Sequence, residues 1–307
     1  MFYGAVFACI LLALVVGPFM LPLLYWPYVG FLLFLDRGTP ENSGRPLEWA
    51  RNLKLFGEMA RYFPVKFVRE GPPVDPQRKY LFCYHPHGVI SFGAFLSFAT
   101  NALDFPSLFP GIDRRLLTLD VNFKFPFLRE ILLSLGLCSV SKTSIVNHLS
   151  KPGRAVAIVT GGAAESLQAK PGTYHLTLKH RKGFAKVALQ TQADLIPVFG
   201  FGENDVYEIA EVEKGGFIER MQKGMKKYLS FTIPMLRGRG ITGLLPLQEP
   251  IFVVAGEPIP CPKLKGATPT QEEIDDYHDA YVRALIALYN RYKKNVSFNR
   301  IESLRLE

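Results

Sequence analysis

Two histidines that stand two residues apart, His85 and His87, are the side chains of this sequence best suited to acid–base chemistry. Imidazole titrates near neutral pH, so it can take a proton from an alcohol in the cell. Pro86 restricts the backbone between them, and Gly88 permits a sharp turn directly after them. The interpretation we favour is a general base held on a rigid turn.

Two other interpretations of the pair stay open. A metal site is one, but the other four histidines of the chain show no ligand spacing relative to the pair, and a zinc site needs three or four ligands. A purely structural histidine is the other, and it is the usual explanation for a lone residue of this type. We expect no metal.

The carboxylate of Glu165 is the second candidate, because it follows an apolar run and the two glycines Gly161 and Gly162. These glycines, or Gly88 after the histidine pair, can turn backbone N–H groups toward an anion or a developing oxyanion. Glu165 could then orient a catalytic imidazole or hold an acceptor hydroxyl. The alternative is a carboxylate that only stabilises the start of a helix through the helix dipole.

A basic cluster precedes a predicted helix over 184–192, with Arg181 and Lys182 directly before Gly183. The N-terminus of a helix favours an anion even without charged neighbours. The cluster therefore predicts a grip on a phosphate-bearing ligand such as coenzyme A. A solvated basic surface is the alternative.

Short apolar runs that alternate with helical patterns must hold these groups in place. Strands are predicted over 79–84, 115–121, 154–160, 194–200 and 250–255, and helices near 88–100, 126–137, 143–150, 184–192 and 216–229. This alternation predicts an α/β fold, a mixed central sheet with helices on both faces. The histidine pair, the glycine turn before Glu165, and Glu203 with Asn204 then follow the carboxyl ends of strands, where ligand sites usually lie.

Two further helices are expected outside this alternation. Thr270 and Glu273 form a capping box before an apolar stripe of helical spacing, which predicts a helix that packs on the core. An amphipathic helix is predicted around 47–62, within a connector over 36–78. The predicted organisation is a membrane segment over 1–35, this connector, and a catalytic domain over 79–307.

Residues 1–35 carry no charged side chain. About 20 apolar residues cross a bilayer core, but Pro18, Pro22 and Pro27 interrupt this run, so we expect a bent span or a hairpin that dips into the membrane. Basic residues follow it and predict that the rest of the chain faces the cytosol. A signal peptide is the alternative, but the run lacks a basic start and a small-residue cleavage motif.

The net charge is +9, from 36 Lys and Arg against 27 Asp and Glu. This balance favours an anionic partner: a membrane surface, a phosphate-rich ligand or nucleic acid. Nucleic acid is disfavoured, because no zinc-finger spacing and no RNA-recognition motif is present. The four cysteines are scattered without a C-x-x-C pair, so we expect them to be reduced. The basic amphipathic stretch over 216–247 suits a membrane surface or a core helix.

Taken together, these motifs resemble the type 2 diacylglycerol O-acyltransferase family, which includes monoacylglycerol and wax-alcohol acyltransferases. The resemblance rests on His85–Gly88, Asn122–Phe123 with Pro126 and Leu128–Glu130, Gly161–Leu167, Arg181–Phe184 and Phe201–Asn204. These motifs lie between residues 79 and 262, and the apolar amino-terminal segment is a further parallel.

The resemblance implies an enzyme that transfers a fatty acyl group from acyl-CoA to the free hydroxyl of diacylglycerol, with acyl-CoA as co-substrate and no other cofactor. It implies a glycerolipid-acyltransferase-like fold with a membrane-embedded amino-terminal hairpin. It also implies a place in the endoplasmic reticulum membrane, and on lipid droplets, with the catalytic domain facing the cytosol. A homo-oligomer stays open. His87 is implied as the catalytic histidine, and Asn122, Glu203 and Asn204 are motif residues.

The sequence departs from the related pattern in two places. The broader glycerolipid acyltransferase superfamily carries an acid five residues after its histidine, but Ile90 and Phe92 stand at those positions here. Glu165 as the assisting carboxylate is therefore a conjecture. The short apolar lipid-binding signature of some members is matched only loosely by Phe31–Leu35.

Two rival functions come from other classes. A membrane-bound serine hydrolase needs a G-x-S-x-G elbow, and Gly88–Gly93 has the wrong spacing for one. A lipid-binding protein without enzymatic activity explains the apolar segment and the basic stretch, but not the three motifs that contain His87, Glu165 and Arg181. The acceptor is undecided, because diacylglycerol, monoacylglycerol and long-chain alcohols share the reacting hydroxyl.

Overall fold

The computed structural model describes residues 22–209 and 245–294 without a gap, and also Leu12, Phe19, Gly216, Arg220, 236–240, Gly243 and 304–306. Residues 1–21 of the membrane segment predicted over 1–35 lie outside the described residues, apart from Leu12 and Phe19, and so does most of the helix predicted over 216–229. Cys9 lies outside them too, while Cys83, Cys138 and Cys261 are free thiols.

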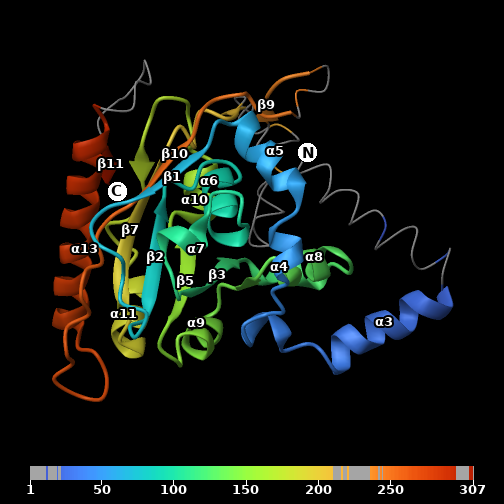
Figure 1. Cartoon of the computed structure of the whole chain (residues 1–307), viewed down its shortest axis with the longest axis horizontal. Coiled ribbons are helices and arrows are strands. Elements are labelled where there is room, and N and C mark those ends of the chain that lie inside the picture. The colour runs from blue at the N-terminus through green and yellow to red at the C-terminus, as the bar shows by residue number, and fades with distance from the viewer. Residues whose placement is uncertain are drawn as a thin grey trace.

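A mixed seven-stranded sheet forms the centre of the fold, as the sequence predicts (Figure 1). The strands, in spatial order, are β1 (Lys66–Arg69), β10 (Phe252–Ala255), β7 (Asp194–Phe201), β2 (Tyr80–His85), β5 (Arg154–Val159), β3 (Asp113–Thr118) and β4 (Leu137–Ser139). The last five run parallel to one another, whereas β10 is antiparallel to β7 and parallel to β1. Two small sheets pair β6 (His175–Leu176) with β11 (Arg305–Leu306) and β8 (Glu208–Ile209) with β9 (Leu236–Arg237).

Helices cover both faces of the sheet, and each face has its own apolar core. One core involves α4 (Glu48–Arg51), α5 (Lys54–Tyr62), α6 (Phe92–Ala94), the π-helix η3 (Phe95–Ala99), α7 (Phe105–Leu108) and α8 (Leu128–Ser134). The other involves α9 (Lys142–His148), α11 (Gly183–Thr191) and α13 (Gln271–Tyr292). Strand β2 explains the division, since Tyr80, Phe82 and Tyr84 point to the first core while Leu81 and Cys83 point to the second.

The capping box is confirmed at the start of α13. The Thr270 hydroxyl accepts a hydrogen bond from the Glu273 amide over 3.2 Å, and the Glu273 carboxylate accepts one from the Thr270 amide over 2.8 Å. The predicted apolar stripe is buried against the sheet, including Ile274, Tyr277 and Tyr281. Figure 1 shows this long helix along one side of the sheet.

Three local predictions differ from the structure. The helix expected over 88–100 begins only at Phe92, because Ser91 adopts a left-handed conformation with φ +61°. It then continues as a π-helix. The periodicity of the sequence does not reveal a π-helix, because its turns are wider than those of an α-helix. The amphipathic helix around 47–62 is broken into α4 and α5 at Asn52–Leu53. Strands β1, from the predicted connector, and β4 were not expected, and they are the two edge strands of the central sheet.

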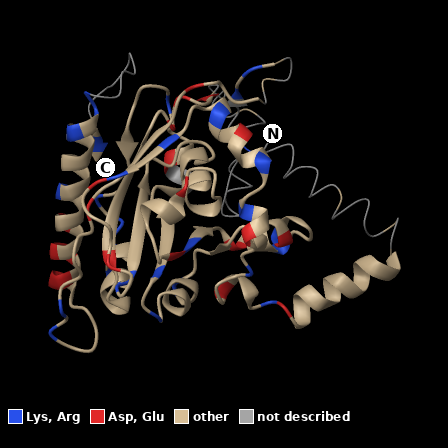
Figure 2. Cartoon of the chain, in the orientation of Figure 1, with Lys and Arg blue, Asp and Glu red and all other residues tan. Residues whose placement is uncertain are grey.

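Helix α3 (Pro22–Phe34) projects from the body of the molecule and carries no charged side chain (Figures 1 and 2). Leu23 is 88% exposed and Phe34 is 83% exposed. Among the residues that the structure describes, no helix is both long enough and apolar enough to cross a bilayer. The membrane hairpin is therefore not confirmed.

The residues that follow α3 fix it to the body. The buried Arg129 guanidinium forms an ion pair with Asp36, and these two residues also form a hydrogen bond through the Asp36 carbonyl. Within α3, Tyr28 stacks on Phe127 with ring centroids 5.7 Å apart, and its hydroxyl donates to Glu130. The Leu128–Glu130 motif thus contributes to attaching the apolar helix.

Candidate active site

The candidate residues converge where three neighbouring strands of the sheet have their carboxyl ends. Strands β7, β2 and β5 are neighbours and run parallel, so their carboxyl ends meet. His87 follows β2, Glu203 follows β7, and Glu165 follows β5 in the short helix α10 (Gly162–Ser166). The sequence predicted that each of these residues follows a strand, and the strand order of the sheet brings them together.

The His87 imidazole is held in one tautomer by its own turn. Its Nδ1 lies 2.9 Å from the carbonyl oxygen of Gly88, and a carbonyl only accepts, so Nδ1 carries the hydrogen. Neutral His87 therefore keeps its free electron pair on Nε2. Burial lowers the pKa of His87 below its usual 6.5, and the positive charge of Arg181 lowers it further. The imidazole is thus a neutral base at cellular pH.

Glu165 bridges two segments of backbone through both oxygens of its carboxylate. Oε2 accepts a hydrogen bond from the His87 amide over 3.1 Å, and Oε1 accepts one from the Thr177 amide over 2.7 Å. Glu165 is 3% exposed, and burial raises its pKa although both amides and Arg181 act against the rise. The carboxylate that the sequence suggests as an assisting group therefore reaches the backbone of His87 and not its imidazole.

Gly161 is needed beside this carboxylate. A side chain at Gly161 would overlap the carboxylate of Glu165. An oxyanion placed against Gly161 would consequently lie next to Glu165. Of the three glycines predicted to stabilise an oxyanion, Gly88 lies against Glu203 and Gly161 against Glu165, whereas a Cβ at Gly162 would lie 3.3 Å from Nη1 of Arg181.

His85 is fully buried at the end of β2. Its Nε2 lies 2.9 Å from the hydroxyl of Tyr281 on α13, and the Thr160 hydroxyl lies 2.9 Å from its Nδ1. Burial lowers its pKa to about 3, so the ring is neutral. These contacts fasten β2 to β5 and α13, and they support a structural role for His85.

Glu203 is fully buried behind the turn that carries His87. Its Oε2 accepts hydrogen bonds from the Tyr84 hydroxyl over 2.5 Å and from the Gly93 amide over 2.9 Å. Gly88 has φ +57°, and a Cβ there would lie 2.7 Å from Cγ of Glu203. Burial raises the pKa of Glu203 to about 7. Glu203 thus packs against the turn at Gly88, whereas Glu165 contacts it at the His87 amide.

The two amide residues of the motifs have structural contacts. Asn204 donates to the carbonyl oxygen of Thr173 over 2.7 Å. Asn122 donates to the Thr118 hydroxyl over 2.8 Å, and it follows β3, which β5 separates from β2. Asn122 is therefore further along the edge from His87 than Glu165 or Glu203.

Two basic side chains at the start of α11, Arg181 and Lys182, contact different parts of the protein. Arg181 donates from Nη1 to the carbonyl oxygen of Thr160 over 3.1 Å, which places its guanidinium at the end of β5. Lys182 instead forms an ion pair with Asp275 on α13, with 2.7 Å between Nζ and Oδ1. Gly183 begins α11.

Sequence reasoning missed four residues that shape this site: Tyr84, Thr160, Thr177 and Tyr281. The tyrosines stand in apolar patterns and read as core. The only sign in the sequence that these tyrosines have polar partners is their hydroxyl group, because a buried tyrosine hydroxyl normally has a hydrogen-bonding partner. Thr177 acts through its backbone amide, which no side-chain pattern reveals.

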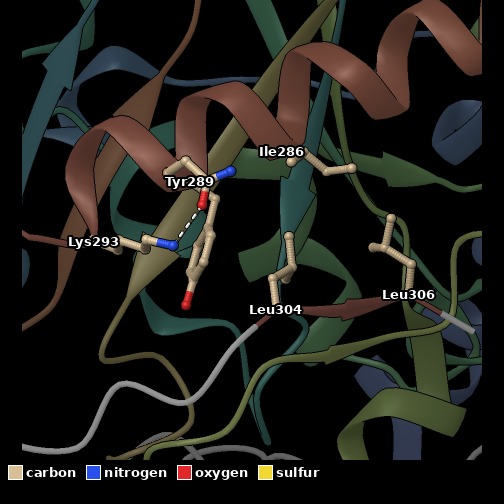
Figure 3. Close-up of a pocket in the computed structure, with 6 residues that line it drawn as sticks. Ile286, Tyr289, Lys293, Leu304 and Leu306 are labelled. Atoms are coloured by element: carbon tan, nitrogen blue, oxygen red, sulfur yellow. Dashed lines mark hydrogen bonds between the residues drawn. The ribbon is translucent and has the colours of Figure 1, made fainter.

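A separate cleft lies between the end of α13 and β11 (Figure 3). It is lined by Ile286, Tyr289, Asn290, Lys293, Leu304 and Leu306. This lining contains no histidine and no carboxylate, so it offers no base for acyl transfer. Among the described residues, no three His, Cys, Asp or Glu side chains converge where a metal ion could bind.

Comparison with known proteins adds to this geometry. A family described as diacylglycerol acyltransferase matches residues 14–307. Diacylglycerol O-acyltransferase 2A of Umbelopsis ramanniana is 46% identical over 92% of this chain and 82% of its own length. The human diacylglycerol O-acyltransferase 2 is 42% identical over 91% of this chain and 73% of its own length. A crystal structure of the 1-acyl-sn-glycerophosphate acyltransferase PlsC from Thermotoga maritima aligns with a TM-score of 0.45 and 12% identity, over 97% of this chain and 99% of that one.

Proposed function

This chain belongs to the diacylglycerol acyltransferase family and is an acyltransferase, and we propose that it esterifies diacylglycerol with acyl-CoA, using His87 as the general base. The observation that carries the proposal is the hydrogen bond between Nδ1 of His87 and the Gly88 carbonyl. It leaves Nε2 as the one basic atom of the ring. His87 is also the histidine of the pair that is partly exposed, whereas His85 is fully buried.

The proposed reaction is direct transfer. Nε2 of His87 takes the proton of the acceptor hydroxyl as its oxygen attacks the thioester carbonyl. The new C–O ester bond forms, the C–S bond breaks, and the thiolate leaves with the proton that His87 held. The lowered pKa of His87 favours this release. No covalent enzyme intermediate is required, and a positioned proton transfer of this kind contributes roughly 10²–10⁴-fold in rate.

The substrates are proposed to reach His87 from two sides. The basic start of α11, with Arg181, Lys182 and Gly183, would receive acyl-CoA. The neutral lipid would come from the membrane, since α3 presents Leu23, Leu24 and Phe34 to the surroundings. We propose that the protein lies in the endoplasmic reticulum membrane or on lipid droplets. The sheet would face the cytosol, because the uncharged residues 1–35 are followed by basic residues such as Arg37, Arg45 and Arg51.

The test is an assay of membranes that contain the protein, with labelled acyl-CoA and a panel of acceptors. Triacylglycerol as the main product from diacylglycerol supports the proposal. If acylation of monoacylglycerol or formation of wax ester were the dominant activity, the proposed acceptor would be wrong but the proposed chemistry would stand. Binding of acyl-CoA without any ester product would contradict the proposal and favour a lipid-binding protein.

A further inference from the structure

We propose that Arg181 is a catalytic residue that stabilises the negative charge developing on the thioester carbonyl oxygen, and does not hold the phosphates of coenzyme A. This inference rests on the function proposed above and deepens it. Within the basic cluster at the start of α11, Arg181 then acts at the reacting carbonyl and Lys182 does not.

The position of the guanidinium is the first argument. Nη1 of Arg181 donates to the carbonyl of Thr160, directly beyond β5. The Thr160 amide in turn donates to the carbonyl of Tyr84 in β2, over 3.4 Å. The guanidinium is therefore tied to the two strands that carry His87 and Glu165, and its charge acts on both of those residues.

The space around the guanidinium is the second argument. Gly162 has φ +58°, and the absence of its side chain leaves room for Arg181, since a Cβ there would lie 3.3 Å from Nη1. Arg181 is exposed, so its remaining N–H groups are accessible to a substrate. A planar guanidinium with several N–H donors suits a developing oxyanion.

The alternatives nearby are less suitable for the oxyanion. The carboxylate of Glu165 lies against Gly161 and would repel a negative charge placed there. Lys182 is turned away to Asp275 on α13. Arg181 thus remains as a cation that acts on His87 and whose guanidinium hydrogen-bonds a backbone carbonyl and not a carboxylate.

The charge of Arg181 serves both halves of the reaction. When the acceptor oxygen attacks, its proton moves to Nε2 of His87 and the electron pair of the C=O bond moves to the carbonyl oxygen, where Arg181 faces it. When that pair returns, the C–S bond breaks and the thiolate takes the proton from His87. Arg181 favours this last transfer too, because a cation beside protonated His87 destabilises it.

The experiment compares two acyl donors that differ only in their phosphates. Acyl-CoA carries them, and the matching acyl-pantetheine carries the same thioester without them. We expect Arg181→Gln to lower kcat about 10²–10³-fold with both donors, the usual cost of removing one oxyanion donor. Arg181→Lys should retain more activity than Arg181→Gln, with both donors. Lys186→Gln, which removes one exposed positive charge one helical turn further along α11, is the matched control and should leave kcat unchanged.

Each outcome decides a different question. A loss that appears with acyl-CoA as a raised KM and vanishes with acyl-pantetheine would overturn the inference and assign Arg181 to the phosphates. Equal activity of Arg181→Gln and the wild type would overturn it as well. Absence of triacylglycerol with the wild type and acyl-CoA would instead refute the proposed function. Thermal unfolding of each variant in the same membranes separates loss of folding from loss of chemistry.

Discussion

The carboxylate of Glu165 accepts a hydrogen bond from the backbone amide of His87, with 3.1 Å between Oε2 and the nitrogen. Its other oxygen accepts from the amide of Thr177. Glu165 therefore contacts the main chain of His87, the proposed general base, and the Gly88 carbonyl orients the ring. Glu165 as the assisting carboxylate of His87 remains a prediction.

Substitution of Glu165 separates these two ways of assisting His87. Glu165→Gln keeps one carbonyl oxygen as an acceptor but loses the second, so we expect kcat to fall about 10-fold. Glu165→Ala loses both and frees the turn, and a misplacement of about 1 Å costs on the order of 10²-fold. Steady-state kinetics of both variants check this ranking. If the two variants were equally inactive, Glu165 would be acting on the imidazole through its charge, as the acid of a triad does.

The pH dependence of activity reports on the charge of Arg181. Burial and Arg181 lower the pKa of His87, so the base stays neutral to a lower pH than a free imidazole with its usual pKa of 6.5 would. The rate therefore falls only when the pH drops further. Arg181→Gln removes a positive charge, so the pKa of His87 rises and the acidic limb of kcat/KM moves to higher pH. Profiles of the wild type, Arg181→Gln and Lys186→Gln measure the shift. A limb at the same pH in all three proteins would show that Arg181 does not interact with His87.

The stability of the fold in acid tests the environment of His85. The folded protein holds His85 with a pKa of about 3, against about 6.5 in an unfolded chain. Its contribution is thus complete above pH 6.5 and is lost as the pH falls toward 3. His85→Gln does not titrate, so its free energy of unfolding should depend less on pH in this window, although it starts lower by about 1–3 kcal/mol.

Urea unfolding at several pH values makes this comparison. His148, whose pKa burial lowers to about 4, contributes with the same sign in both proteins, so only the difference between them is informative. Parallel curves for the wild type and His85→Gln would contradict a neutral, buried His85.

The buried pair of Tyr84 and Glu203 makes a prediction about stability. Tyr84→Phe removes the hydroxyl that donates to Glu203 and leaves a buried carboxylate with one partner fewer, which should cost about 1–3 kcal/mol. Tyr80→Phe is the matched control in the same strand, because its hydroxyl donates to the carbonyl of the exposed Asp75, where water can replace it. A cost of about 0.5–1.5 kcal/mol is expected there. Thermal unfolding that ranks Tyr80→Phe as the more damaging change would contradict this account.

Much of the fold could be predicted because its determinants are local. The apolar runs of β2, β5 and β7, and the capping box of α13, are each readable within a few residues. Strand β1 was missed because Lys66–Arg69 is short and half of its residues are charged. The break between α4 and α5 and the π-helix depend on tertiary packing, which periodicity does not record.

The sequence names candidate residues for the site but does not give their contacts. Parallel strands bring His87, Glu165 and Glu203 to one edge, and that follows from strand order. The pair of Lys182 with Asp275 joins residues 93 positions apart, and the pair of Tyr84 with Glu203 joins residues 119 apart. Such partners depend on the packing of elements that are distant in the chain, so a single sequence does not show which way these side chains point.

The most direct test of the central claim is the activity of His87→Gln in membranes that hold correctly folded protein. The variant keeps a polar side chain of similar size but has no basic nitrogen, so it cannot accept the proton of the acceptor hydroxyl. We expect triacylglycerol formation from labelled acyl-CoA and diacylglycerol to fall about 10²–10⁴-fold, with thermal unfolding close to that of the wild type. Retention of most of the activity by folded His87→Gln would contradict the assignment of His87 as the general base.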